Sequence, residues 1–456
     1  MDLSCVYPHS EHFKDTQNEF IELDLIEFDM KHLILLITCV LALTTCTKSS
    51  NTPEEEYDYP TPSAGPTAIV FANGNIPYRI PAIAACPDGT LIAVADYRSS
   101  RQDIGAGKID LHIRTSSDNG LTWGEIIAPE CMTGDGNMTP GNQKAGYGDP
   151  CIVADRKSGK VMVMSCSGFP KFFDGSRTQH QGMARWYSTD KGQTWSGPEY
   201  LDEEYIYSRF DNSAYGAIKG WFVGSGKIHQ SRYTKVGDYY RLYCAGSSYN
   251  GTETANWVIY SDDFGGSWNF LGGCDVSPVA KGDEPKVDEL PNGNIVISSR
   301  NEKGRYFNIF SFTDAASAQG SWGNKYLSSN TCNGVTCDNA CNGEIGIYPV
   351  VRKADGQKIW LALQSLPKGP DRTNVVIFFK TLETEADYDT PQHFASDWDG
   401  CFQVSTTSSA YSTWSLCNDL SLGFLYEENG KDGGYDITYK NLSIQWITDG
   451  EYYPQK

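Results

Sequence analysis

A turn that leads into an apolar strand recurs along this chain and constrains the fold more than any other feature. Its clearest copies are PDGTLIAVAD (Pro87–Asp96), KSGKVMVMS (Lys157–Ser165), VGDYYRLYCAG (Val236–Gly246), PNGNIVISSR (Pro291–Arg300) and ADGQKIWLALQS (Ala354–Ser365), with LSLGFLYEE (Leu420–Glu428) as a weaker sixth. The turn glycines of the first five are 56 to 78 residues apart. Six similar β units with little helical periodicity predict an all-β, six-bladed β-propeller. A β-sandwich and a β-helix are the alternatives, although a β-helix would show a shorter and stricter period.

An octad accompanies this repeat as SSDNGLTW (Ser116–Trp123), STDKGQTW (Ser188–Trp195) and SDDFGGSW (Ser261–Trp268). Its Asp can accept backbone N–H bonds in a tight turn, and its Gly can adopt a positive φ. The closing Trp carries a large apolar face that favours burial. No His, second carboxylate or nucleophile recurs around all three copies. The octads therefore predict self-closing turns that build the framework, and the chemistry is expected on other loops.

The N-terminal segment predicts an exported lipoprotein. Lys31 and His32 precede an apolar run, residues 33–43, which is too short to span a bilayer and suits a signal-peptide core. The LTTC that follows resembles a lipoprotein cleavage box, with Cys46 as the lipidated residue. A buried hydrophobic strand is the alternative. We expect a cell-envelope protein, periplasmic or on the cell surface, that meets the membrane only through a lipid anchor at Cys46.

The remaining boundaries follow from composition. Met30 is a sensible start, so residues 1–29, which are acidic and unlike a leader, are interpreted as an over-extended gene model. Residues 30–46 are then the lipoprotein-type signal peptide. Residues 47–65 are polar and rich in Pro, which is typical of a tether. Residues 66–456 are expected to form the propeller domain.

Charge and cysteine content exclude several classes of partner. The net charge of −20 argues against nucleic acid, which rewards basic surfaces. A local arginine cluster could still bind a small anion, because salt screens long-range repulsion beyond about 10 Å. Eleven of the 14 cysteines follow the leader, and Cys332, Cys337 and Cys341 crowd one loop, where we expect pairing. The histidines beyond the leader lie far from that loop in sequence, so no zinc, other metal or cofactor is expected.

Several short motifs outside the octads carry chemistry. They are YRIP with Arg79, ADYRSSRQD with Arg98 and Asp103, YGDP with Asp149, DEPKVDEL with Glu284, SSR with Arg300, LPKGPDRTNVV with Arg372, SSAYSTW with Tyr411 and LGFLYEE with Glu427. Glu284 stands sixteen residues before Arg300, and Tyr411 sixteen before Glu427. YRIP, the repeated Asp boxes, this ordered set and the AYS…GFLYE tail together resemble the exo-α-sialidases of bacterial type. The resemblance covers residues 66–446.

The resemblance implies a six-bladed propeller that removes terminal α-linked sialic acids from glycoproteins, gangliosides or oligosaccharides. Three arginines would bind the substrate carboxylate, and by position they are Arg79, Arg300 and Arg372, with Glu427 steadying the first. Arginine suits this task because its guanidinium makes bidentate, charge-assisted bonds. The resemblance assigns Tyr411 as the nucleophile and Glu284 as its base, with the arginine field and Glu284 favouring the phenolate. Asp103 would be the general acid, with retention through a tyrosyl-linked intermediate.

Some assignments have rivals. Asp96 competes with Asp103, Arg352 with Arg372, and Asp283 with Glu284. Arg98 and Asp149 resemble family residues near the O4 hydroxyl of the sugar, or are ordinary loop charges. The long segment between Arg372 and Tyr411 includes an insert, TEADYDTPQHFASDWDGC, that could reshape the rim of the pocket. A trans-sialidase or intramolecular trans-sialidase would share these residues, and a non-catalytic glycan-binding propeller is the alternative from another class.

Overall fold

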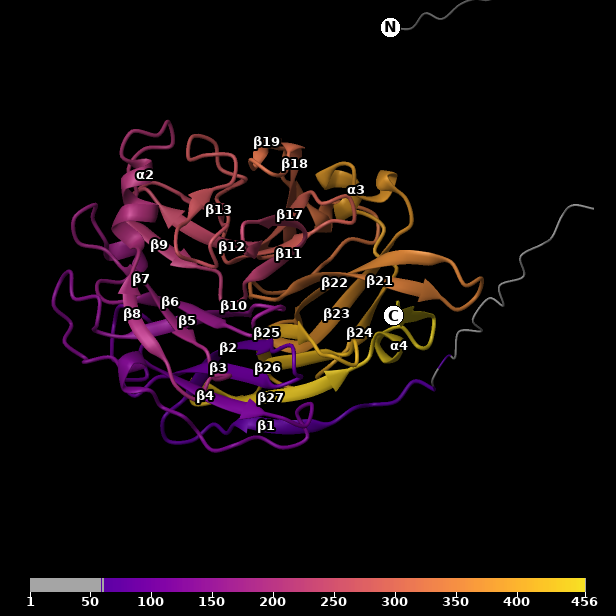
Figure 1. The fold of residues 1–456 in the computed structure, drawn as a ribbon, viewed down its shortest axis with the longest axis horizontal. Helices are drawn as coiled ribbons and strands as arrows, with labels where there is room; N and C mark the ends of the chain where they lie inside the picture. The colour runs from indigo at the N-terminus through magenta and orange to yellow at the C-terminus, as the bar shows by residue number, and fades with distance from the viewer. Residues whose placement is uncertain (1–58, 60, 456) are drawn as a thin grey trace, which may run out of the picture. The chain divides into compact units, whose positions relative to one another are not determined.

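The computed structural model describes residue 59 and residues 61–455, so the predicted leader, the predicted lipidation site Cys46 and most of the predicted tether lie outside the described residues. Within the unit that begins at Tyr59, six β-sheets are arranged around a central axis as a β-propeller (Figure 1). In that part of the chain, no helix is long and apolar enough to cross a membrane. The predicted all-β fold class and the six-bladed propeller are confirmed.

Most strands of each sheet follow one another along the chain. The first contains β2 (Tyr78–Ala85), β3 (Leu91–Tyr97) and β4 (Asp110–Ser116). The second contains β5 (Tyr147–Ala154), β6 (Val161–Ser167), β7 (Gly182–Ser188), β8 (Ser196–Tyr200) and β10 (Gly226–Lys227). The third contains β9 (Gly220–Val223), β11 (His229–Val236), β12 (Tyr239–Tyr249), β13 (Thr254–Ser261), β14 (Asn269–Phe270) and β15 (Val279–Ala280).

The fourth sheet contains β16 (Pro285–Glu289), β17 (Ile295–Asn301), β18 (Gly304–Asp314), β19 (Gln319–Trp322) and β20 (Tyr326–Leu327). The fifth contains β21 (Ile345–Arg352), β22 (Lys358–Gly369), β23 (Thr373–Leu382), β24 (Gly400–Gln403) and β28 (Tyr452–Pro454). The sixth contains β1 (Thr67–Phe71), β25 (Ser409–Leu416), β26 (Leu422–Lys431) and β27 (Gly434–Leu442). The α-helices are short: α2 (Ser208–Phe210), α3 (Pro391–Ala395) and α4 (Ile444–Ile447).

The turn of each sequence repeat joins the first two consecutive antiparallel strands of one sheet. Gly89 lies between β2 and β3 with a φ of 91°, and Gly293 lies between β16 and β17 with a φ of 86°. Glycine suits these turns because it lacks the Cβ that makes positive φ costly. In the weaker sixth copy, the turn between β25 and β26 places Leu420 at a φ of 64°. That substitution explains why the sixth unit is the hardest to recognise in the sequence.

The two ends of the described unit close the ring. β1 pairs antiparallel with β27, so a strand from the start of the unit completes the sheet formed by its last long strands. β28 then returns to the fifth sheet and pairs with β21. Each closure therefore joins segments that are far apart in the sequence. Apolar faces of neighbouring sheets pack between them, with Trp186, Trp257 and Trp414 essentially buried.

The octads form the predicted self-closing turns. In the first copy, Ser116 Oγ accepts a bond from Gly120 N at 2.9 Å, and Asp118 Oδ1 accepts one from Thr122 N at 2.9 Å. The second and third copies repeat both bonds. Trp268 is fully buried, whereas Trp123 is half-buried. The turns lie next to β4, β7 and β13 and contribute no residue to the site described below.

The cysteine prediction was wrong for the crowded loop. All eleven cysteines in the described part of the chain are free thiols, including Cys332, Cys337 and Cys341. Cys332 is exposed whereas Cys341 is buried. The insert between Arg372 and Tyr411 packs Phe394 and Trp398 into the core beside Phe307, away from the site.

His112, on β4, makes stability depend on pH. Its Nδ1 lies 2.7 Å from Tyr78 Oη, its ring stacks on Tyr97, and burial lowers the pKa of His112 to about 4. The folded chain disfavours the charged imidazole, so this contribution to stability is present above pH 6.5 and is lost as pH falls towards 4. We expect the urea midpoint to fall over that window, and to fall less in His112→Gln. Parallel curves for the two proteins would contradict this.

Candidate active site

The predicted site residues come from inner strands of several sheets and gather at one end of the ring. Figure 1 shows β2, β10 and β25 near its centre and β8 towards its outer edge. Arg79 lies on β2, Asp149 on β5, Arg300 on β17, Tyr411 on β25 and Glu427 on β26. Glu284 immediately precedes β16, and Arg372 immediately precedes β23. Residues more than three hundred positions apart are therefore brought together.

Irregularities in three inner strands aim these side chains. The strand register shifts between Arg79 and Ala82 on β2, between Gly148 and Cys151 on β5, and between Ser409 and Ser412 on β25. In the first two, the residue before a proline has positive φ: Ile80 at 52° and Asp149 at 56°. Proline cannot donate to the ladder, and β-bulges redirect side chains. The YRIP and YGDP motifs are therefore bulge sequences as well as carriers of functional groups.

Tyr411 and Glu284 form the centre of the site. The Tyr411 hydroxyl donates a hydrogen bond to Glu284 Oε1. Arg300 Nη1 lies 2.9 Å from Glu284 Oε2 and 3.5 Å from the Tyr411 oxygen. Burial, followed by the charge of Glu284, raises the pKa of Tyr411 well above 10, although Arg300 and Arg372 act in the opposite direction. The resting residue is a neutral phenol rather than the phenolate favoured by the sequence interpretation.

Glu427 anchors one side of this centre. It is fully buried, and its Oε1 accepts bonds from Arg79 Nε at 2.7 Å and from Ile80 N at 2.8 Å. Its Oε2 accepts a bond from Tyr411 N at 3.1 Å. Burial alone would lower the pKa of Arg79, but the Glu427 carboxylate outweighs it and raises that pKa, so the guanidinium stays charged. One carboxylate thus sets the position of both Arg79 and the Tyr411 backbone.

The three predicted arginines surround the Tyr411 ring or its oxygen. The guanidinium carbons of Arg79 and Arg372 each lie 5.6 Å from the ring centroid. Within the described residues, no hydrogen bond or ion pair engages the half-buried guanidinium of Arg372. The rival Arg352 lies on an exposed edge, paired with Asp355 and Glu383. The arginine at this cluster is therefore Arg372.

A second cluster surrounds Arg98, which is almost buried. Its Nη1 lies 3.0 Å from Asp103 Oδ1, and its Nη2 lies 2.8 Å from Asp96 Oδ2. Asp149 Oδ1 is 3.8 Å from the same Nη2, and the Asp149 N–H donates to Asp96. Asp96 is fully buried, and burial raises its pKa to about 7 despite Arg98. The Asp103 side chain is 71% exposed, so Asp103, and not Asp96, is open to a ligand.

A cavity of about 500 Å³ adjoins both clusters. Its lining includes Asp103, Asp149, Gln181, Phe172, Phe173, Phe222, Ser247, Lys281 and Glu284. Phe173 is exposed, and its ring packs edge-on against Phe172 and Tyr249. The site therefore places cationic groups on one side of Tyr411 and Glu284, and a partly aromatic hollow beyond Asp103. In the described part of the chain, no three His, Cys, Asp or Glu side chains are arranged to hold a metal ion.

One neighbour of the site was missed by sequence reasoning, and two others were named only as rivals. The Tyr435 ring lies 5.1 Å from the Arg79 guanidinium, on β27, and no motif surrounds it. Asp96 Oδ2 accepts a hydrogen bond from Arg98 Nη2, although the sequence pointed to Asp96 only as a rival of Asp103 for the role of general acid. Asp283 Oδ2 lies 3.1 Å from Arg300 Nε, so it accompanies Glu284 rather than replacing it. Adjacency to Glu284 was the only sequence signal for Asp283.

Comparison with known proteins finds sialidases among the relatives of this chain. No family model matches the chain. A sialidase of Micromonospora viridifaciens is 26% identical over 388 residues, which is 81% of this chain and 52% of that protein. A sialidase of Paraclostridium sordellii is 28% identical over 380 residues, covering 81% of this chain and 85% of that protein. The chain thus spans about half the length of the first relative.

Solved structures support the same fold. A Hadza microbial sialidase superimposes with a TM-score of 0.61 at 19% identity, over 81% of this chain and 66% of that one. The intramolecular trans-sialidase of Ruminococcus gnavus gives 0.63 at 18% identity, over 84% and 98%. At these identities the structures show the fold alone, whereas the sequence relatives extend over most of this chain. The resemblance noted in the sequence is confirmed: over most of its length, this chain is similar to bacterial sialidases.

Proposed function

We propose that this protein is an exo-α-sialidase that hydrolyses terminal sialic acids of glycoproteins, gangliosides or oligosaccharides. The observation that carries the proposal is the Tyr411 phenol bonded to Glu284 and surrounded by Arg79, Arg300 and Arg372. A carboxylate next to the reacting carbon needs cationic donors beside the nucleophile. A carboxylate nucleophile would meet like-charge repulsion there, whereas a neutral phenol does not.

The proposed reaction proceeds by double displacement. The Tyr411 oxygen attacks the anomeric carbon and passes its proton to Glu284, while the glycosidic C–O bond breaks and Asp103 protonates the leaving oxygen. Asp103 then removes a proton from water, which attacks the same carbon, and Tyr411 leaves with the proton returned by Glu284. Two inversions give net retention. The raised pKa of Tyr411 is consistent with proton transfer during the attack rather than before it.

The test is the release of sialic acid from an α-linked sialoside by the purified protein. Free sialic acid as the product would support hydrolysis. A sugar internally closed by one of its own hydroxyls would indicate an intramolecular trans-sialidase, and sialic acid joined to a new acceptor would indicate a trans-sialidase. Release of no sialic acid in any form by folded protein would sink the enzymatic proposal and leave the glycan-binding propeller.

The aromatic wall of the cavity is expected to contact the sugar. Phe173 is exposed, so Phe173→Ala should leave folding intact while removing apolar contact area. Loss of part of a phenyl contact corresponds to about 1 kcal/mol, or roughly a fivefold rise in KM, with kcat little changed. Leu121→Ala, at another exposed apolar residue outside the cavity, is the control. Equal KM values for Phe173→Ala and the parent would remove Phe173 from the binding surface.

Export and lipidation are also proposed, on the sequence alone. If Cys46 carries the lipid, the full chain produced in a bacterial host that processes lipoproteins should partition into the membrane fraction and incorporate labelled fatty acid. Cys46→Ser should release it into the soluble fraction without label. A parent protein that is itself soluble and unlabelled would contradict the anchor.

A further inference from the structure

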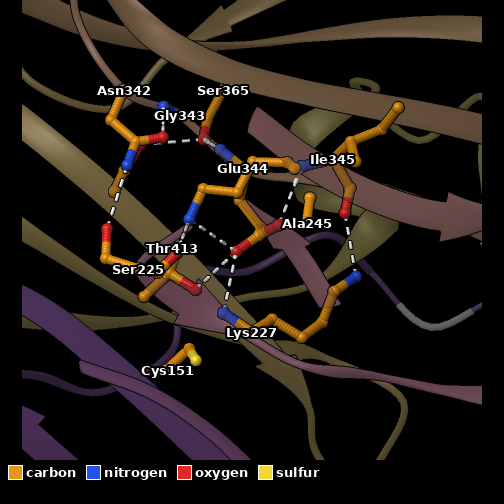
Figure 2. Close-up of polar contacts among 12 residues, drawn as sticks. Cys151, Ser225, Lys227, Ala245, Asn342, Gly343, Glu344, Ile345, Ser365 and Thr413 are labelled. Atoms are coloured by element: carbon orange, nitrogen blue, oxygen red, sulfur yellow. Dashed lines mark hydrogen bonds and ion pairs between the residues drawn. The ribbon is translucent and has the colours of Figure 1, made fainter. Parts of the chain in front are cut away.

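Near Tyr411 and Glu284, a buried carboxylate joins the two segments that carry these residues. Glu344 precedes β21 and is fully buried. Its Oε2 accepts a hydrogen bond from Thr413 Oγ1 at 2.8 Å and one from Lys227 N at 3.3 Å, and it lies 3.5 Å from Lys286 Nζ (Figure 2). Its Oε1 accepts from Ile345 N at 3.2 Å. Both oxygens are therefore engaged, as a buried carboxylate requires.

The partners of Glu344 are neighbours of the reacting residues. Thr413 lies two residues after Tyr411 on β25, and Lys286 lies two residues after Glu284 on β16. Two residues of a strand span about 7 Å. The bridge from Thr413 through Glu344 to Lys286 therefore connects the same two segments as the hydrogen bond between Tyr411 and Glu284. It lies two residues further along each segment.

No backbone ladder makes that connection. β16 belongs to the fourth sheet and β25 to the sixth, so they share no sheet hydrogen bonds. Glu344 comes from the fifth sheet, and Lys227 from β10 of the second. The separation of Tyr411 and Glu284 is consequently set by side chains that meet between the sheets. Arg300 contacts the two reacting residues themselves, and Glu344 contacts Thr413 and Lys286 on the segments that carry them.

The packing around this carboxylate leaves little freedom. Gly226 has a φ of 98°, and a Cβ on it would lie 2.7 Å from Lys286 Nζ, 2.8 Å from Thr413 Oγ1 and 2.9 Å from Glu344 Oε2. Lys286 Nζ also donates to Ser225 O. Asn342 Nδ2 donates to Ser225 Oγ at 3.0 Å (Figure 2). The three side chains thus close over a glycine that no larger residue can replace without moving them.

We propose that Glu344 is a positioning residue for the reaction: through Thr413 and Lys286 it holds the strands of Tyr411 and Glu284 at the spacing that their proton transfer requires. The inference rests on the proposed function and adds a residue that touches neither substrate nor reacting atoms. Displacements near 1 Å at a reacting pair can lower rates about 100-fold. Because the arginine cluster lies on other elements, the change is expected in kcat rather than in KM.

The test compares kcat and KM of the full chain on an α-linked sialoside for four variants. Thr413→Val removes only the hydroxyl that bonds Glu344 and keeps the shape, whereas Thr413→Ser keeps the hydroxyl. Glu344→Gln removes the negative charge that faces the Lys286 ammonium. Asp288→Asn is the control, because Asp288 is also buried and paired with Lys227 and Arg232, but lies two residues further along β16 than Lys286. Thermal midpoints measure the stability lost in each.

Glu344→Gln is expected to lower kcat about 10- to 100-fold and Thr413→Val about 5- to 10-fold, each with KM within about twofold of the parent. Thr413→Ser and Asp288→Asn should keep most of kcat, even where the midpoint of Asp288→Asn falls. If Glu344→Gln does not fold, the valine and serine variants decide alone.

Two results would overturn the positioning role: Thr413→Val with parental kcat, or Asp288→Asn losing as much kcat as the Glu344 and Thr413 variants. An inactive, folded parent would instead refute the proposed function, so the two failures are distinguishable.

Discussion

Replacing Tyr411 by phenylalanine is expected to lower kcat by a factor on the order of 10⁴ or more, the scale seen when an enzyme loses its nucleophile. The substitution removes the oxygen that donates to Glu284 and leaves the ring between Arg79 and Arg372 in place. Substrate binding through the arginines should persist, so the dissociation constant of a non-hydrolysable sialic acid analogue should change little. Steady-state kinetics and calorimetric titration measure the two effects separately.

Tyr435→Phe provides the control for that experiment. Its ring lies 5.1 Å from the Arg79 guanidinium, close to the 5.6 Å of the Tyr411 ring, so both tyrosines contact the same cation. Tyr435 has no hydrogen bond to Glu284, and the loss of its hydroxyl should change kcat less than about tenfold. Comparable losses in the two variants would mean that a tyrosine near Arg79 matters for packing, and Tyr411 would no longer be the proposed nucleophile.

The framework could be predicted because its signals are local. A tight turn with positive φ needs glycine within a few residues of the strands it joins, so Gly89 and Gly293 are visible in the sequence. The octad bonds also join residues four positions apart, as in Ser116 and Gly120. Leu420 marks the limit of this reasoning, because a leucine at positive φ resembles any strand residue.

The remainder of the site depends on contacts between distant segments. Glu427 bonds Arg79 across 348 positions, and that partnership came from family resemblance rather than from spacing. Tyr435 and Glu344 lie in no recognisable motif, so nothing in the sequence links them to Arg79 or Thr413. The protonation of Tyr411 was misjudged for the same reason. Burial and the Glu284 charge outweigh the nearby arginines, and burial is known only when the sheets are assembled.

The arginines also differ in a way that only the structure reveals. Arg79 is paired with Glu427, and Arg300 is paired with Glu284 and Asp283. Arg372 has no such partner among the described residues, so its donors are available to a substrate carboxylate. A charge-assisted hydrogen bond contributes about 1.5–3 kcal/mol. Arg372 should therefore contribute more binding energy for each hydrogen bond than Arg79 or Arg300, because their guanidiniums are already paired with carboxylates of the protein.

Arg372→Ala is expected to lower kcat/KM about 100- to 1000-fold, which corresponds to the loss of one or two charge-assisted bonds. Because the missing partner is the substrate carboxylate, affinity for a sialic acid analogue should fall, whereas affinity for the corresponding neutral ester should not fall further. Arg352→Ala is the control, since Arg352 pairs with Asp355 and Glu383 on an exposed edge and should change kcat/KM less than about twofold. If acid and ester lose affinity equally in Arg372→Ala, the guanidinium shapes the pocket rather than binding charge. In that case Arg79 and Arg300 would have to hold the carboxylate with donors that Glu427, Glu284 and Asp283 already occupy in part.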